Sequence, residues 1–213
     1  MESGDLDRVV HEIVDQGWSI IDEFVAASVA NELLAEAEAL ESRGSFSPAG
    51  IGRLDRHVVR PEIRGDFVRW ITDEPLTPAR ERYLDQVERI RQNLNRDLFL
   101  GLRTFEAQYA FYPPGTFYRP HLDRFSDADE RAVTLLLYLN HDWTSEDGGA
   151  LRLHLPGSTL DILPFAGVSV IFLSQRIEHE VLPARRTRFS LTGWYRRASL
   201  RDVIEGRGFG SRE

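Results

Sequence analysis

The sequence predicts a mainly β protein with helices in its first half and a β-sandwich or barrel in its second half. Three observations support this fold class. Apolar residues recur at helical spacing in the first half, and in the second half they form short runs separated by Pro, Gly and Asp clusters. Of the 213 residues, 42% are hydrophobic, which is enough for a buried core, so we expect a single domain over residues 1–213.

Three helices are expected in the first half. The first contains Leu6–Ile13 at helical spacing and stops at Gly17. The second has Ser28 as its N-cap and ends at Gly44. The third begins at Thr77-Pro78, with proline at the first helical position, and continues with an apolar stripe at steps of three and four residues.

The strands are expected mainly in the second half. Residues 1–103 should form a helical support, with one short strand at Trp18–Phe24 and a Gly- and Pro-rich loop at residues 45–61. The β core is expected over residues 104–195, followed by a polar tail at residues 196–213. Its five apolar runs are predicted strands: Thr104–Phe111, Val133–Asn140, Ala150–Leu155, Val168–Leu173 and Thr187–Tyr195. The second of these is apolar on both faces, which predicts a covered central strand.

The composition excludes several kinds of chemistry. The chain has 34 acidic and 26 basic residues and a net charge of −8, which argues against a surface for nucleic acid or anionic lipid. It has no Cys, so a disulfide, a thiolate metal site and a cysteine nucleophile are excluded. It has no Lys either, which excludes Schiff-base chemistry and leaves Arg or protonated His to bind an anion.

Nothing in the sequence indicates a membrane or an export route. No apolar run approaches the ~20 residues of a membrane-spanning helix. The N-terminus, Met1–Gly4 followed by Asp5 and Asp7, lacks the basic region and apolar core of a secretory signal. We therefore expect a cytoplasmic location.

The residues that carry chemistry are two of the six histidines and one aspartate. If His121-x-Asp123 lies in a strand, its first and third residues project from the same face. His179 follows the apolar run Val168–Leu173, and a barrel would bring it alongside this pair. Two His and one carboxylate on one face of an octahedron form the ligand set of non-haem Fe(II) oxygenases. Alone, an H-x-D tripeptide also arises by chance, as a surface His and a loop Asp.

The last predicted strand places several polar side chains on one face. With a period of two, Arg188 shares its face with Ser190, Thr192 and Trp194 in an otherwise apolar strand. Burying a guanidinium is costly unless it meets an anion, so Arg188 is a candidate carboxylate clamp. The alternative is an arginine at the exposed end of the strand.

Together these residues make the sequence similar to a known family. His121-x-Asp123, then His179, then Arg188-x-Ser190, set in a run of strands, resemble the Fe(II)/2-oxoglutarate-dependent dioxygenases. The likeness is to the prolyl 4-hydroxylase branch, in particular the hypoxia-inducible-factor prolyl hydroxylases and their bacterial relatives. It extends over Val9–Arg196 through further stretches in the same order, namely Ile63–Asp66 with Trp70-Ile71, Leu137–Asn140 with Asp142-Trp143, Gly148–Arg152, Glu178–Val181 and Thr192–Tyr195.

The resemblance implies a role for each site residue. His121, Asp123 and His179 would bind Fe(II), and no catalytic residue is implied beyond this metal centre. Arg188 and Tyr138 would bind the distal carboxylate of 2-oxoglutarate. The other residues implied for the cosubstrate pocket are Tyr112, Thr192 and Trp194. The implied fold is a double-stranded β-helix, a jelly-roll barrel of the cupin-like kind, braced by the N-terminal helices.

The implied reaction is the hydroxylation of an unactivated C–H bond with O2, in which 2-oxoglutarate gives succinate and CO2. The implied substrate is a prolyl residue of a protein or peptide, with ascorbate as an accompanying reductant. The loop at residues 45–61 and the stretch Tyr112–His121 are shorter than in the animal enzymes, so the animal substrate is not transferred. Two alternatives stay open: a hydroxylase of a free amino acid or other small molecule, and a non-catalytic barrel that binds or senses metal and 2-oxoglutarate.

Overall fold

The described part of the chain, residues 3–51, 58–123 and 131–197 of the computed structural model, contains three α-helices, two short 3-10 helices and eleven β-strands. The helices are α1 (Ser3–Asp15), α2 (Ala27–Ser42), η2 (Ile71–Asp73), α3 (Pro78–Leu98) and η3 (Ser145–Asp147). The strands are β1 (Trp18–Ile21), β2 (Ser47–Pro48), β3 (Phe67–Trp70), β4 (Leu102–Tyr112), β5 (Tyr118–His121), β6 (Arg131–Tyr138), β7 (Leu151–Leu155), β8 (Ser158–Ile162), β9 (Ser169–Leu173), β10 (Glu178–Val181) and β11 (Arg188–Arg197).

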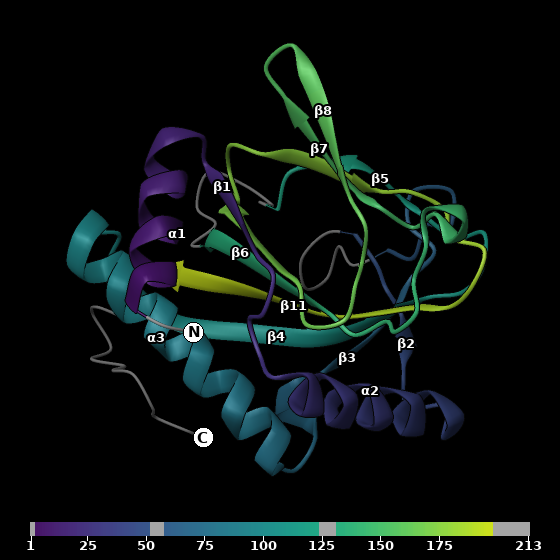
Figure 1. Ribbon diagram of the computed structural model, residues 1–213. Coiled ribbons are helices and arrows are strands. Elements are labelled where there is room, and N and C mark those ends of the chain that lie inside the picture. The colour runs from purple at the N-terminus through teal and green to yellow at the C-terminus, as the bar shows by residue number, and fades with distance from the viewer. Residues whose placement is uncertain (1–2, 52–57, 124–130, 198–213) are drawn as a thin grey trace.

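The strands form two antiparallel sheets that face each other. The larger sheet has the order β1-β9-β6-β11-β4-β3-β2, and the smaller sheet has the order β5-β10-β7-β8. The three α-helices pack on the outer face of the larger sheet, and the smaller sheet covers its other face (Figure 1). This architecture confirms the predicted double-stranded β-helix braced by helices.

The helices begin close to where the sequence predicts. α3 starts at Pro78, and the Thr77 side chain caps it by accepting a hydrogen bond from the backbone N–H of Arg80 at 3.3 Å. The predicted cap of α2 is wrong, because this helix starts at Ala27 and Ser28 lies inside its first turn. A serine cap is worth only about 1 kcal/mol, so burial of the apolar face of α2 decides where that helix begins.

The N-terminal half supplies three strands as well as helices, whereas a helical support with one short strand was predicted. β1, at the start of the predicted strand Trp18–Phe24, pairs with β9 at one edge of the larger sheet. β2 and β3 extend the opposite edge beside β4, and β2 lies within the predicted loop at residues 45–61. These two strands are short and show no alternation of buried and exposed residues, so the sequence carries little signal for them.

Each face of the larger sheet covers an apolar core. One core lies between this sheet and the helices, and the other lies between the two sheets. β11 alternates between them: Phe189 and Leu191 belong to the first core, whereas Arg188 lies against Tyr112 and Tyr138 in the second. The predicted period of two is therefore confirmed. β6 pairs with both β9 and β11 and is buried over all but its first residue, as predicted for the central strand.

A buried polar cluster ties the helices to the larger sheet. Glu36 of α2 accepts hydrogen bonds from Arg80 Nε of α3 at 2.8 Å and from the Tyr109 hydroxyl of β4 at 2.8 Å. It also accepts one from the Thr77 hydroxyl at 2.5 Å. Arg80 and Tyr109 are 4% and 0% exposed, so the Glu36 carboxylate neutralises a buried cation.

The Glu36→Ala substitution is expected to lower the free energy of unfolding by about 3 kcal/mol, because it leaves the Arg80 guanidinium buried without its anion. The matched control is Glu32→Ala, since Glu32 also lies on α2 and pairs with an arginine of α3. In that pair, Glu32 and Arg82 are 47% and 49% exposed, so the loss should stay below about 1 kcal/mol. Urea unfolding followed by circular dichroism measures both changes. Equal losses would contradict this account.

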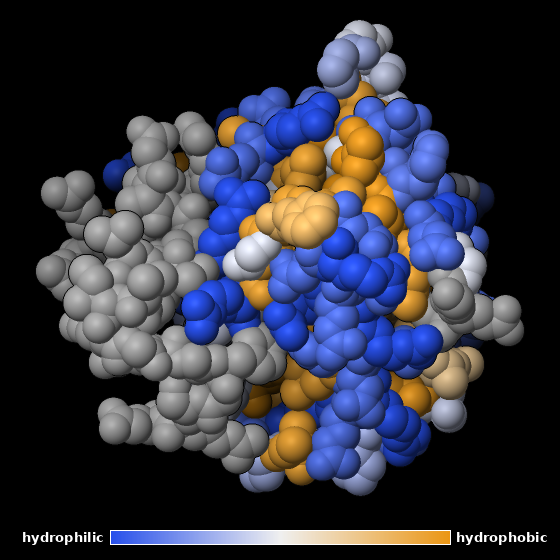
Figure 2. Space-filling model, turned by 90° about the vertical axis from the view of Figure 1, so that its left-hand side faces the viewer, coloured by the Kyte–Doolittle hydropathy of each residue, from blue (hydrophilic) through white to orange (hydrophobic). Residues whose placement is uncertain are grey.

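Among the described residues, no helix is both long enough and apolar enough to cross a membrane. The face that carries α1 and the C-terminal end of α3 is mainly hydrophilic, with apolar patches on either side of a polar band (Figure 2). Residues 52–57 of the predicted loop and residues 198–213 of the predicted tail lie outside the described part of the chain.

Candidate functional site

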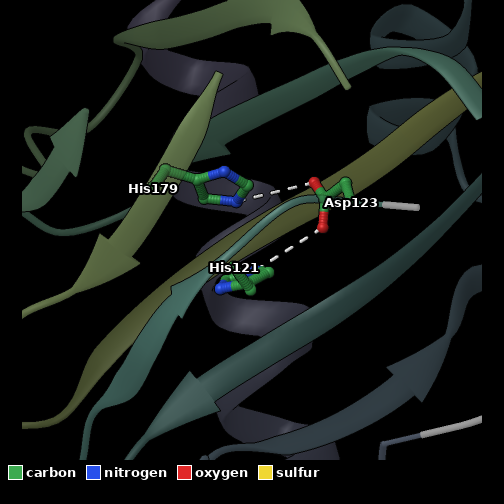
Figure 3. Close-up of side chains that lie close together, drawn as sticks. All are labelled: His121, Asp123 and His179. Atoms are coloured by element: carbon green, nitrogen blue, oxygen red, sulfur yellow. Dashed lines mark ion pairs between the residues drawn. The ribbon is translucent and has the colours of Figure 1, made fainter. Parts of the chain in front are cut away.

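The three predicted metal ligands lie together. His121 is the last residue of β5 and His179 lies in β10, where the antiparallel register places the two histidines opposite each other. Asp123 Oδ1 lies 3.6 Å from His121 Nε2, and Asp123 Oδ2 lies 3.6 Å from His179 Nε2 (Figure 3). One ligand atom from each residue lies within 4.8 Å of the others, so a single cation can contact all three.

Asp123 reaches this cluster by a different route from the one predicted. β5 ends at His121, so the alternation of a strand does not place the Asp123 side chain. The chain bends after the strand, and each oxygen of the Asp123 carboxylate faces one of the two imidazoles (Figure 3). The H-x-D spacing therefore brings the two side chains together because the strand ends at His121 and the chain bends at Asp123.

The second nitrogen of each imidazole faces a backbone carbonyl two residues earlier in the chain. His121 Nδ1 lies 2.8 Å from Arg119 O, and His179 Nδ1 lies 3.1 Å from Ile177 O. A carbonyl oxygen can only accept, so we assign the proton of each neutral ring to Nδ1. Both Nε2 lone pairs are then available to a metal, and the carbonyls fix the orientation of the rings.

The electrostatics of the cluster favour a cation. Burial lowers the pKa of His179 to about 4, although the Asp123 carboxylate raises it. Burial raises the pKa of Asp123, but the neighbouring imidazoles outweigh this effect and hold that pKa below its usual range. At neutral pH the cluster therefore presents an ionised carboxylate beside the neutral imidazole of His179. This is the protonation state in which these groups bind a divalent metal.

Two further side chains support His121. The ring of Tyr118 stacks on the imidazole with centroids 3.5 Å apart, and the Arg64 guanidinium lies 4.2 Å from the Tyr118 centroid. Arg64 is fixed by Asp66, which accepts from its Nε at 2.7 Å and from its Nη2 at 2.5 Å. Arg64 Nη1 also donates to Gly50 O at 3.3 Å. The Arg64 side chain, oriented by Asp66, thus connects the loop that begins at residue 45 to the strand that carries His121.

A second group of polar side chains lies on β6 and β11, two neighbouring strands of the larger sheet. Arg188 is 1% exposed, and its Nε donates to Gly149 O at 2.9 Å. Its Nη2 and the buried hydroxyls of Tyr138 and Ser190 have no hydrogen-bond partner within the described structure. Ser190 lies opposite Tyr138 in the sheet, and the Arg188 guanidinium lies 5.1 Å from the Tyr138 ring centroid. Buried polar groups are nearly always paired, so these donors indicate a site for an anionic ligand.

The tyrosines beside Arg188 stay protonated and can donate to that ligand. Burial raises the pKa of Tyr138 to about 12, although the charge of Arg188 lowers it. Burial also raises the pKa of Tyr112 well above its usual value, and the Tyr112 ring centroid lies 5.2 Å from the Arg188 guanidinium. All three residues are at most 6% exposed, so hydrogen bonds formed here would be little weakened by water.

Thr192 and Trp194 follow Arg188 and Ser190 at alternate positions of β11. Trp194 is paired with Thr134 in β6 and is 5% exposed. Thr134 also donates a hydrogen bond to Asp123, so the register places Trp194 at the metal-cluster end of the inner face and not beside Arg188. The cosubstrate roles of Tyr112, Tyr138, Thr192 and Trp194 stay predictions.

The fold and the site together define a class of protein. A double-stranded β-helix that holds two His and one Asp on its inner strands, with a buried arginine in the last strand, is the design of a non-haem iron oxygenase. The family model of the 2OG-Fe(II) oxygenase superfamily matches residues 107–196. The crystal structure of a Pseudomonas putida prolyl-4-hydroxylase has a TM-score of 0.83 and 44% identity, and the match covers 91% of this chain and 100% of that one. The chain belongs to the 2OG-Fe(II) oxygenase superfamily.

Within this superfamily the chain belongs to the prolyl 4-hydroxylase branch. A Trichoplax adhaerens prolyl hydroxylase, solved with a hypoxia-inducible-factor peptide fragment, is 31% identical with a TM-score of 0.81, over 92% of this chain and 94% of that one. The Caenorhabditis elegans hypoxia-inducible factor prolyl hydroxylase is 31% identical over 95% of this chain and 30% of its own length. Human Egl nine homolog 1 is 31% identical over 89% of this chain and 46% of its own length. The chain thus spans less than half the length of these two curated relatives. These matches confirm the predicted family.

One contact of the metal cluster involves a residue that the sequence analysis did not single out. Thr134 Oγ1 donates a hydrogen bond to Asp123 Oδ2 at 2.9 Å. Thr134 lies in the apolar run that was predicted to be the central strand. A hydroxyl in a strand that is otherwise apolar on both faces is the signal that would have located it, because such a group needs a buried partner.

Proposed function

We propose that this protein is an Fe(II)- and 2-oxoglutarate-dependent dioxygenase that hydroxylates a prolyl residue of a protein or peptide. The observation that carries the proposal is the presence, in one barrel, of the His-Asp-His cluster and of unpaired buried donors around Arg188. A barrel that binds only a metal has no need of a second, anion-binding group, and a barrel that binds metal and 2-oxoglutarate without catalysis would form no succinate. The alternative substrate is a free amino acid or other small molecule, and the experiment described below distinguishes it from a prolyl peptide.

The residues of this chain fit both Fe(II) and 2-oxoglutarate. His121, Asp123 and His179 would hold Fe(II) through two nitrogens and one oxygen, which leaves further coordination positions open. Arg188 and Tyr138 would bind the distal carboxylate of 2-oxoglutarate through N–H and O–H donors. When bound, Fe(II) and 2-oxoglutarate supply the redox chemistry, in which O2 is consumed, succinate and CO2 are formed and one oxygen atom enters the substrate.

The protein's own contribution is positioning. Gly149 O fixes Arg188 Nε, and a glycine is required there, because its φ is +68° and a Cβ would lie 2.8 Å from that of Ala184. Tyr112 and Tyr138 belong to the apolar core between the two sheets, so water has little access to the donors beside them. Donors that are fixed in a dry site need no rearrangement when an anion arrives.

The peptide substrate is supported by the relatives. The Pseudomonas putida structure is of a prolyl-4-hydroxylase, and the Trichoplax adhaerens enzyme was solved with a peptide. We carry this substrate class to the present chain as part of the proposal. Ascorbate as the reductant and a cytoplasmic location also belong to the proposal.

The test combines binding and turnover. Metal-free protein is titrated anaerobically with Fe(II) and 2-oxoglutarate, and the visible charge-transfer band of the chelate is recorded. O2 is then admitted with proline-containing peptides or with the same peptides carrying Ala for Pro. We expect the band, succinate, and a mass gain of one oxygen atom on the proline peptides alone. Succinate that rises only with free amino acids would favour the small-molecule hydroxylase, and no band or succinate would favour a binding module.

The Tyr138→Phe substitution is expected to weaken 2-oxoglutarate binding by about 10- to 100-fold without destabilising the empty protein. The Tyr138 hydroxyl has no partner in the described structure, so its removal breaks no existing hydrogen bond. A hydrogen bond to a charged carboxylate is worth about 1.5–3 kcal/mol, which gives the expected loss of affinity. Calorimetry with 2-oxoglutarate and urea unfolding measure the two quantities.

The control for this change is Tyr109→Phe, another buried tyrosine of the larger sheet. Its hydroxyl donates to Glu36 at 2.8 Å on the helix side of the sheet. It should lower the unfolding free energy and leave 2-oxoglutarate binding unchanged. The role of Tyr138 is wrong if its variant loses stability but keeps its affinity for 2-oxoglutarate.

A further inference from the structure

Two hydroxyl groups, one in a strand of the larger sheet and one directly after its neighbouring strand, support the metal cluster. Thr134 of β6 donates to Asp123 Oδ2 at 2.9 Å, and Thr134 Oγ1 lies 2.8 Å from Ser174 Oγ. Ser174 directly follows β9, the strand next to β6 in the larger sheet. Thr134 and Ser174 are both 0% exposed. The two hydroxyls therefore form a contact by which the larger sheet reaches a metal ligand.

The proton positions in this chain of hydrogen bonds follow from the acceptor. An ionised carboxylate can only accept, so the single hydroxyl proton of Thr134 is directed to Asp123. The oxygen of Thr134 is then an acceptor, and the proton between the two hydroxyls belongs to Ser174. The hydrogen bonds run in one direction, from Ser174 to Thr134 to Asp123, and each strengthens the next.

Packing alone does not explain these two polar groups. The neighbours of Thr134 along β6 are apolar, and valine has nearly the same shape as threonine, so a hydroxyl at this position costs free energy unless it is paired. What the hydroxyl adds is direction, because it fixes where one carboxylate oxygen lies. A carboxylate whose Oδ2 already accepts a hydrogen bond is disposed to give a metal a single oxygen, which leaves more of the metal's positions open.

We propose that Thr134, with Ser174 behind it, is a positioning residue that holds the Asp123 carboxylate in the orientation that binds the metal. The inference rests on the proposed function only in requiring that Asp123 is a metal ligand. Outer contacts of this kind typically account for a factor of about 10 to 100 in metal affinity. The effect should therefore be visible in metal binding itself, before any cosubstrate or turnover is involved.

The test is a titration of metal-free protein with Mn(II), in which free Mn(II) is followed by its electron paramagnetic resonance signal. Thr134→Val should raise the dissociation constant about 10- to 100-fold, and Thr134→Ser, which keeps the hydroxyl, should restore it to near the wild-type value. Ser174→Ala leaves Thr134 in place but removes its donor, so a smaller loss of a few-fold is expected.

The matched control is Ser169→Ala. Ser169 is also 0% exposed and lies in β9, but its hydroxyl donates to Leu136 O, away from Asp123. It should lower the urea midpoint and leave the Mn(II) affinity unchanged. All titrations are run at a temperature at which circular dichroism shows each variant to be folded. If Thr134→Val does not fold, the contrast between Ser174→Ala and Ser169→Ala decides the question.

The outcomes separate the inference from the proposed function. Wild-type Mn(II) affinity in Thr134→Val, or equal losses in Ser174→Ala and Ser169→Ala, would overturn the positioning role and leave the proposed function standing. Failure of Thr134→Ser to bind better than Thr134→Val would also overturn it. If the wild-type protein itself bound no Mn(II), the proposed function would fall, and the inference with it.

Discussion

The His179→Ala protein is expected to fold, to bind Fe(II) at least 100-fold more weakly than wild type and to form no succinate. His179 is 4% exposed, and its Nε2 lies 3.6 Å from Asp123 Oδ2, so alanine leaves only one nitrogen and one oxygen donor. Four-ligand metal sites bind with about 10–16 kcal/mol in total, so one ligand is worth roughly 3 kcal/mol, or somewhat more than 100-fold. The absence of the Fe(II)·2-oxoglutarate band, recorded without O2, is the direct measurement.

The matched control is His154→Ala. His154 lies in β7, next to β10, and its Nε2 lies 3.1 Å from Glu180 Oε1 rather than in the cluster. This variant should keep the wild-type Fe(II) affinity, the band and the rate of succinate formation. An unchanged band in His179→Ala would mean that the metal site is elsewhere in the chain.

The Arg188→Met protein is expected to lose about 100-fold or more in 2-oxoglutarate affinity while its Fe(II) affinity changes less than about 3-fold. Removing one partner of a buried charge pair costs about 2–5 kcal/mol, and Arg188 is the buried cation among the unpaired donors. The free energy of unfolding should stay within about 1 kcal/mol of wild type in the absence of ligand, because an unpaired buried charge is replaced by an apolar chain of similar length.

Calorimetric titrations with 2-oxoglutarate and with metal, together with urea unfolding, measure the three quantities. Arg152→Met is the control, since Arg152 pairs with Asp161 at 2.7 Å and both side chains are partly exposed. It should leave all three close to wild type. Equal losses of Fe(II) and 2-oxoglutarate in Arg188→Met would contradict its role as the carboxylate clamp.

The sequence predicts the alternating parts of the fold and the residues that break the alternation. The period of two in β11 correctly places Arg188 on the inner face. A guanidinium in an otherwise apolar strand is unusual, and this marked Arg188 as a candidate for anion binding. His121, Asp123 and His179 were predicted as one cluster and lie as one, with ligand atoms within 4.8 Å. The exact route of Asp123 was not predictable, because it depends on β5 ending at His121, and the ends of four-residue strands carry no pattern.

What the sequence does not show are contacts set by the packing of one sheet on the other. Thr134 lies in the larger sheet, whereas Asp123, eleven residues earlier, lies in the bend that follows β5 of the smaller sheet, and no periodicity relates them. The stack of Arg64, Tyr118 and His121 likewise joins a loop to a strand 57 residues later. Such contacts are formed only when segments that are distant in the sequence come together in the folded chain. Only the presence of a polar group in an apolar setting can mark them in advance.

The position of β5 has a consequence for the lifetime of the protein in a cell. β5 lies at the edge of the smaller sheet, where its outer side makes a short bridge to residues 63–65, and it carries His121 opposite His179 of its neighbour β10. A cation bound by both histidines would link β5 to β10 by metal–ligand bonds, in addition to the backbone hydrogen bonds between these strands. Edge segments are where local opening begins, and opened segments are what proteases cleave. The metal-loaded protein should therefore be cleaved near β5 more slowly than the metal-free protein, which limited proteolysis of the two forms would measure.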